Sequence, residues 1–151
     1  MNSTEGDGSV AVRVARVAHH VIAWALVVGL GFQVFLAGLG VFSSASNFAT
    51  HRDTGYLLEL LPVLLLVAAA VGRLGRRQIL MPIVIFALFI LQSVFVGLRD
   101  SMPEVAALHP VNGFLILFLS VQLAREAWAR SRSGATASSA ARPAASEAPG
   151  T

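Results

Sequence analysis

Four long apolar stretches constrain this chain more than any other feature of its sequence. A helix of about 20 apolar residues is needed to cross a hydrocarbon core about 30 Å thick. Four stretches meet this requirement, at residues 17–42, 54–72, 79–98 and 105–124. Each is expected to be a helix, because an unpaired peptide group is costly in lipid. Since the connections are short, we predict an all-α membrane protein, a four-transmembrane-helix antiparallel bundle.

The composition agrees with a surface that faces lipid. Hydrophobic residues make up 56% of the 151 residues and charged residues 13%, whereas soluble domains have about 25% charged residues. The bundle is predicted to fill residues 17–128, after a cytoplasmic N-terminal segment at 1–16. Residues 129–151 are rich in Ala, Ser and Pro and are expected to be a disordered cytoplasmic tail. A removable signal peptide is not evident, because the first ten residues lack a basic start.

The distribution of arginine predicts the orientation. All 11 basic residues are Arg, and all but Arg52 and Arg99 flank one side of the predicted spans. The positive-inside rule places that side, with both termini, in the cytoplasm of a multi-pass protein of the cell membrane. Trp24 and Trp128 lie near the same interface, as belt residues do. The arginines flank apolar runs and form no single patch, which argues against nucleic acid. Cysteine is absent, which excludes disulfides and thiolate metal sites.

The two halves of the predicted bundle form an internal repeat. In each half a Gln precedes a Gly by five residues, and a His precedes a second Gly by four. The residues are Gln33, Gly38, His51 and Gly55 in the first half and Gln92, Gly97, His109 and Gly113 in the second. Each half is therefore a helix hairpin with a His at the outer start of its second helix. The alternative is that apolar helix pairs resemble each other by chance, because they are built from few residue types.

The paired histidines are the main candidate site. His51 and His109 belong to the second and fourth helices, which lie diagonally, about 11–14 Å apart, if neighbouring axes are 8–10 Å apart. Two inward imidazoles could bind one iron from opposite sides, and His is a common axial ligand of haem. Gly55 and Gly113 share the helix face of each His and leave room for a flat macrocycle. Gly38 and Gly97 are expected to do likewise, the alternative being close helix packing.

Charged and polar residues surround this pair. Arg52 and Arg99 are expected to bind haem propionates, or else to extend to the interface as ordinary arginines. Glu59 is ionisable within a span and is a functional candidate for that reason. With Gln33 and Gln92 it is expected to form a polar layer beneath the pocket. His19 and His20, at the inner end of the first helix, are interpreted as solvated or hydrogen-bonded residues.

A four-helix unit of this pattern resembles one half of heme A synthase. The resemblance covers residues 17–128 and rests on the Gln, Gly and His positions of the repeat. It implies that His51 and His109 are axial ligands. The catalytic half of that family has an acidic residue, often with cysteines, in its first outer loop, and residues 43–50 contain neither. The chain is therefore more similar to the cofactor-carrying half, and a second copy could complete the bundle pair as a homodimer.

These observations predict a membrane protein that binds haem b through two histidines and works in electron transfer, haem handling or sensing. The alternatives are a small transporter or channel-like subunit that uses Glu59 and the glutamines, and an accessory protein that packs against a membrane partner. Enzyme chemistry has little support. The sequence has no nucleophile–base pair, phosphate loop or zinc pattern.

Overall fold

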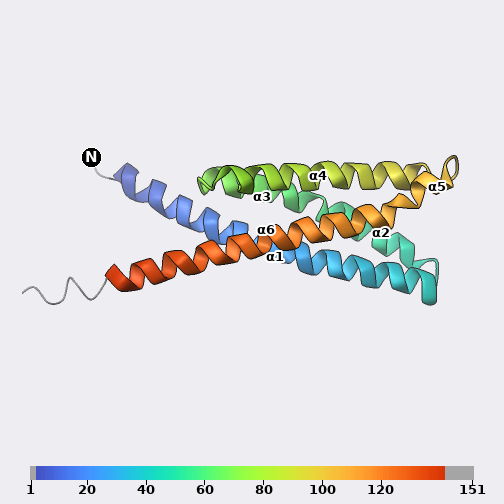
Figure 1. The fold of residues 1–151 in the computed structure, drawn as a ribbon, viewed down its shortest axis with the longest axis horizontal. Helices are drawn as coiled ribbons and strands as arrows, with labels where there is room; N and C mark the ends of the chain where they lie inside the picture. Colours follow the sequence, from blue (N-terminus) through green and yellow to red (C-terminus); the bar gives the residue numbers. More distant parts are fainter. Residues whose placement is uncertain (1–2, 142–151) are drawn as a thin grey trace, which may run out of the picture.

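A computed structural model describes the backbone of residues 3–141 and the side chains of residues 10–130. The described chain is helical apart from short connections and contains no strand (Figure 1). Its elements are α1 Ser3–Phe42, α2 Asn47–Leu58, α3 Leu60–Val71, α4 Arg76–Gly97, α5 Pro103–Ala106 and α6 Leu108–Ala141. Four segments are long and apolar enough to span a membrane: Val10–Phe42, Asn47–Val71, Arg76–Gly97 and Pro103–Arg130. The predicted all-α, four-span fold is confirmed.

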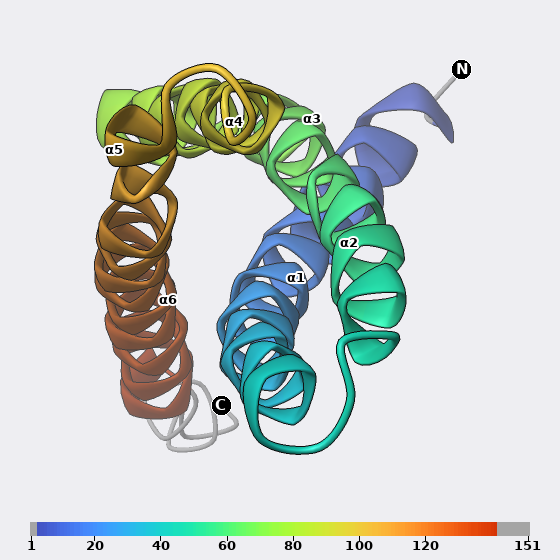
Figure 2. The ribbon, with the colours of Figure 1, turned by 90° about the vertical axis from the view of Figure 1, so that its right-hand side faces the viewer.

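The spans form one antiparallel bundle. Helix α1 packs against α2, α3 and α6, and α4 packs against α3 and α6. Seen along the bundle, α2 and α6 lie on opposite sides, as expected for the second and fourth spans (Figure 2). The chain enters and leaves at the same end as the α3–α4 connection (Figure 1), which we call the terminal end. The α1–α2 and α4–α5 connections define the other, or loop, end.

Apolar side chains occupy both the interior and the exterior of the bundle. The middle is filled by large residues that are almost fully buried, namely Leu26, Leu65, Ile85, Ile116 and Leu123. Equally apolar residues point outward, such as Val28, which is 70% exposed, and Phe114, which is 65% exposed. A surface of this kind is stable in lipid and not in water. The chain is thus a multi-pass membrane protein.

Two glycines let α2 approach α1 closely. A Cβ added at Gly40 would overlap the ring of Phe48, and one added at Gly29 would overlap the side chain of Leu58. Close approach at small residues is how helices gain van der Waals contact in a bilayer. This contact fixes the first hairpin at both ends of α2.

The second span is one apolar segment, Asn47–Val71, as predicted, with a local break in its helix. Helix α2 ends at Leu58 and α3 begins at Leu60. The cause is Pro62, which has no N–H to offer the carbonyl of Leu58. Glu59 lies at this interruption, where its N–H donates to the carbonyl of Gly55 at 3.1 Å.

At both ends of the chain, helix extends beyond the predicted spans. Helix α1 begins at Ser3, so most of the expected N-terminal segment continues the first span as helix. Helix α6 continues to Ala141, whereas a disordered tail was expected from residue 129. Alanine is the best helix former, and the first proline of the tail is Pro143. Residues 142–151 lie outside the described residues.

Candidate functional site

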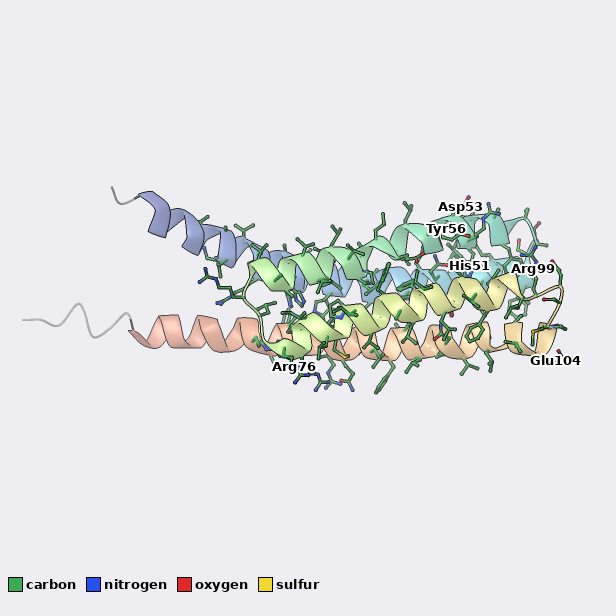
Figure 3. The ribbon with its side chains drawn as sticks, turned by 90° about the horizontal axis from the view of Figure 1, so that it is seen from above. His51, Asp53, Tyr56, Arg76, Arg99 and Glu104 are labelled. Carbon is green, nitrogen blue, oxygen red and sulfur yellow. The ribbon has the colours of Figure 1, made fainter. Side chains whose placement is uncertain are left out.

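The histidines of the two hairpins meet inside the bundle at the loop end. His51 projects from the beginning of α2, and His109 from the beginning of α6, where Pro110 occupies the first turn. Their ring centroids are 6.1 Å apart with an angle of 66° between the ring planes. Both residues are half-buried. Figure 3 shows His51 directed between the ribbons, away from the exposed Asp53 and Tyr56 of the same helix. The structure therefore brings the predicted pair together.

Each imidazole contacts a backbone carbonyl of the preceding membrane span. The Nδ1 atom of His51 lies 3.1 Å from the carbonyl oxygen of Gln33. The Nδ1 atom of His109 lies 3.5 Å from that of Gln92. A carbonyl can only accept, so these contacts place the ring proton on Nδ1 and leave the lone pair on Nε2. Such a second contact is how proteins orient a metal-ligating histidine.

Gln92, the glutamine of the second half, has hydrogen bonds at both ends of its side-chain amide. Its Nε2 donates to the carbonyl of His109 at 2.9 Å. Its Oε1 accepts from Nδ2 of Asn112, which also donates to the carbonyl of Leu88 at 2.9 Å. Asn112 is only 6% exposed and was not among the predicted site residues. The signal that would have found it is a polar residue inside a span, one turn after His109.

Gln33, the glutamine of the first half, has no hydrogen bond to its side-chain amide within the described residues. Gln33 is 9% exposed, yet neither Oε1 nor Nε2 has a hydrogen-bond partner. The position that matches Asn112 in the repeat is Thr54, whose hydroxyl donates to the carbonyl of Thr50 at 2.7 Å instead. The repeat thus conserves the histidine–carbonyl contact but not the bonding of the amide. A buried amide without partners favours a bound polar group or water beside His51.

The four glycines of the repeat fall into two pairs. A Cβ at Gly55 would lie 3.5 Å from Nε2 of Gln33, and one at Gly113 would lie 3.2 Å from Nε2 of Gln92. The contact at Gly113 is tighter than an ordinary one, so this glycine makes room for the amide of Gln92, whereas a Cβ at Gly55 would make an ordinary contact with Gln33. A Cβ at Gly38 or Gly97 would meet no atom within 4 Å. Their expected role beside a macrocycle stays a prediction.

The two arginines of the loop end lie at its mouth. Arg52 pairs with Asp53 at 2.9 Å and Arg99 with Asp100 at 3.6 Å. Their side chains are 61% and 67% exposed, and Arg99 lies at the tip of the bundle in Figure 3. Exposed pairs of neighbouring residues contribute little to stability. Both guanidinium groups are therefore available to another anion, and their pairing with propionates stays a prediction.

The expected polar layer is not a connected network. Glu59 is half-buried, and within the described part of the chain its carboxyl group has no hydrogen bond to either glutamine. Gln33 has no partner for its amide, and Gln92 bonds to Asn112 and to the backbone of His109. Direct hydrogen bonds between described side chains therefore do not join Glu59 to the glutamines.

A second polar cluster, at the terminal end, was missed. Of the two alternatives given for His19, solvation is excluded, since the residue is 1% exposed, and its Nε2 has no hydrogen-bond partner within the described residues. Gln78, which is fully buried, donates from Nε2 to Glu126 at 3.1 Å. Glu126 also pairs with Arg77 at 2.7 Å and Arg130 at 3.5 Å. Helical periodicity would have found His19, because the buried positions of α1 recur every three or four residues. They include Ala15, His19, Ala23, Leu26 and Leu30.

A bare metal ion has no evident cage here. Within residues 10–130, no group of three or more His, Asp or Glu side chains lies close enough together to hold one. The pair of imidazoles at the loop end is thus two ligands short of an ordinary four-coordinate site.

Comparison with known proteins links part of the chain to one family model. Residues 33–98 match the model of DUF6220, a family of unknown function. The matched part begins at Gln33 and contains His51, Glu59 and Gln92, while His109 lies beyond it. No curated protein and no solved structure matches the chain.

Proposed function

We propose that this chain is a membrane protein that binds one haem b, with His51 and His109 as the two axial ligands. The observation that supports this most strongly is the distance between the imidazole rings. A metal–nitrogen bond of about 2 Å on each side, together with the two ring radii, separates the ring centres by about 6 Å when two imidazoles share one ion. The rings of His51 and His109 are 6.1 Å apart.

Two protein ligands are sufficient for haem and insufficient for a bare ion. The porphyrin supplies four nitrogens, so the protein needs to add only the axial pair. The carbonyl contacts at Nδ1 favour Nε2 as the ligating atom of each ring. The unpartnered amide of Gln33 adds a polar group beside His51 that a bound molecule would satisfy. The resemblance to the cofactor-carrying half of heme A synthase supports the same assignment.

The role that fits this ligation is electron transfer or haem handling. An iron with two axial imidazoles has no open coordination position, which suits one-electron transfer. The protein's part is to hold the rings, exclude water and anchor the propionates, for which Arg52 and Arg99 are the candidates. The excess of arginine at the terminal end supports cytoplasmic termini and a site near the outer face of the cell membrane.

Absorption spectroscopy of the purified protein in detergent tests the proposal. After addition of hemin, the wild-type protein should give a Soret band and, on reduction, the sharp bands of a low-spin haem with two axial imidazoles. His51→Ala and His109→Ala should each lose the low-spin spectrum, because one axial ligand is gone. A colourless protein after hemin addition would sink the proposal.

His20→Ala is the matched control for these variants. It removes an imidazole from the opposite end of the bundle, where no contact with the candidate site exists. This variant should keep the wild-type spectrum. Retention of the spectrum in all three variants would indicate hemin bound nonspecifically to the apolar surface.

A further inference from the structure

A surface hollow lies between α1 and α6 at the terminal end. It has a volume of about 230 Å³ and is lined by Trp24 of α1 and by Arg125 and Trp128 of α6. The ring of His20 packs against Trp128 with centroids 5.3 Å apart, which steadies one wall. The hollow is open to the outside of the bundle and is thus distinct from the histidine pair, which faces the interior.

The hollow combines an apolar wall with a cation. Within the described residues, Arg125 forms no ion pair, whereas the nearby Arg77 and Arg130 share the carboxylate of Glu126. A guanidinium that forms no ion pair within the described residues, on the same lining as two indoles, can bind an anion attached to an apolar group. A phosphate attached to acyl chains has both parts.

The location of the hollow indicates where that ligand comes from. Arg125 and Trp128 lie close to the end of the fourth span, which runs to Arg130. Tryptophans of this kind lie at the headgroup level of a bilayer. Arginine gathers at the same end of the chain, and such segments attract anionic lipid. The headgroup level of the leaflet at the terminal end therefore coincides with the hollow.

We propose that the hollow binds an anionic phospholipid of this leaflet. Its phosphate pairs with the guanidinium of Arg125, and its glycerol and upper acyl chains lie between Trp24 and Trp128. The bound lipid fills the groove where α1 and α6 separate and fixes the terminal end of the bundle in its leaflet. This assignment is independent of the haem proposal.

Intrinsic fluorescence gives a direct test, because the chain has 2 tryptophans and both line the hollow. The haem-free protein is reconstituted into nanodiscs with a small fraction of brominated lipid, which quenches tryptophan on contact. Brominated phosphatidylglycerol in phosphatidylcholine is compared with brominated phosphatidylcholine at the same fraction. One pairing of Arg with an anionic headgroup, about 1 kcal/mol, corresponds to roughly fivefold enrichment of the anionic lipid.

Substitutions separate the site from general attraction to charge. Arg125→Gln should abolish the preference for the anionic quencher, and Trp24→Phe and Trp128→Phe should each leave a single quenched residue. Arg76→Gln is the matched control, since it removes an arginine of the same end that does not line the hollow, and it should keep most of the preference. Equal quenching by both lipids in the wild type, a preference that survives Arg125→Gln, or no quenching by either lipid would each overturn the assignment.

Discussion

The imidazoles of His51 and His109 lie 6.1 Å apart, although they belong to different hairpins and their helices have no backbone contact with each other. The pair is therefore positioned indirectly. Each histidine contacts the glutamine carbonyl of its own hairpin, and the packing of α1 against α6 holds the two hairpins together. Changes in these supports should alter the site even where they do not touch a histidine. The substitutions below test four such supports, from residues next to the pair to residues at the other end of the bundle.

Asn112→Ala should destabilise the second hairpin. The substitution leaves Oε1 of Gln92 without its donor and removes the additional bond to the carbonyl of Leu88, and a buried group left unpaired costs about 1–3 kcal/mol. Thermal unfolding in detergent should show the loss, and haem affinity should fall with it. Thr54→Ala, at the matching position of the repeat, should change stability by much less. Equal effects of the two substitutions would contradict the asymmetry of the hairpins.

Gln33→Leu and Gln92→Leu should act in opposite directions on the haem-free protein. Gln33 has a buried amide without partners, so an apolar side chain of similar size removes a desolvation cost and should keep or raise the unfolding temperature. Gln92→Leu breaks two bonds and should lower it. Haem affinity should fall in Gln33→Leu if its amide bonds the cofactor. A lower unfolding temperature in Gln33→Leu without haem would contradict its unpaired state.

Gly40→Ala should separate α2 from α1. The added methyl group overlaps the ring of Phe48, and overpacking typically costs about 1–3 kcal/mol. Because α2 carries His51, the low-spin haem spectrum should weaken along with stability. Gly31→Ala is the control on the same helix, since its Cβ has open space. A Gly40→Ala protein with wild-type stability would mean that Phe48 can move aside.

Glu126→Gln should weaken the contact between α4 and α6 at the terminal end. The carboxylate receives Arg77, Arg130 and the amide of Gln78. Arg77 is 61% exposed, so each ion pair contributes at most about 1 kcal/mol. The loss in unfolding free energy should be near this value and should shrink as salt is raised. The haem spectrum should not change, because the site lies at the other end. Indifference to salt would exclude an electrostatic origin.

The sequence by itself determined the spans and the candidate pair. Runs of about 20 apolar residues permit only helices in lipid, and the repeated spacing of Gln, Gly and His placed His51 and His109 at equal depth. Their diagonal arrangement followed from short connections. These features depend on local rules that act within one helix or one hairpin.

Only the tertiary structure decided which polar groups are bonded and which are buried. The helix periodicity of α1 places His19 on the inner face, but its burial against Gln78 depends on where α4 lies. Asn112 completes the bonding of Gln92, whereas Thr54 turns to its own backbone and leaves Gln33 free. In a bilayer, apolar surface does not discriminate between packing arrangements, so close contacts and hydrogen bonds between helices make that choice. Such contacts join residues from distant parts of the chain, and spacing along the sequence does not encode them.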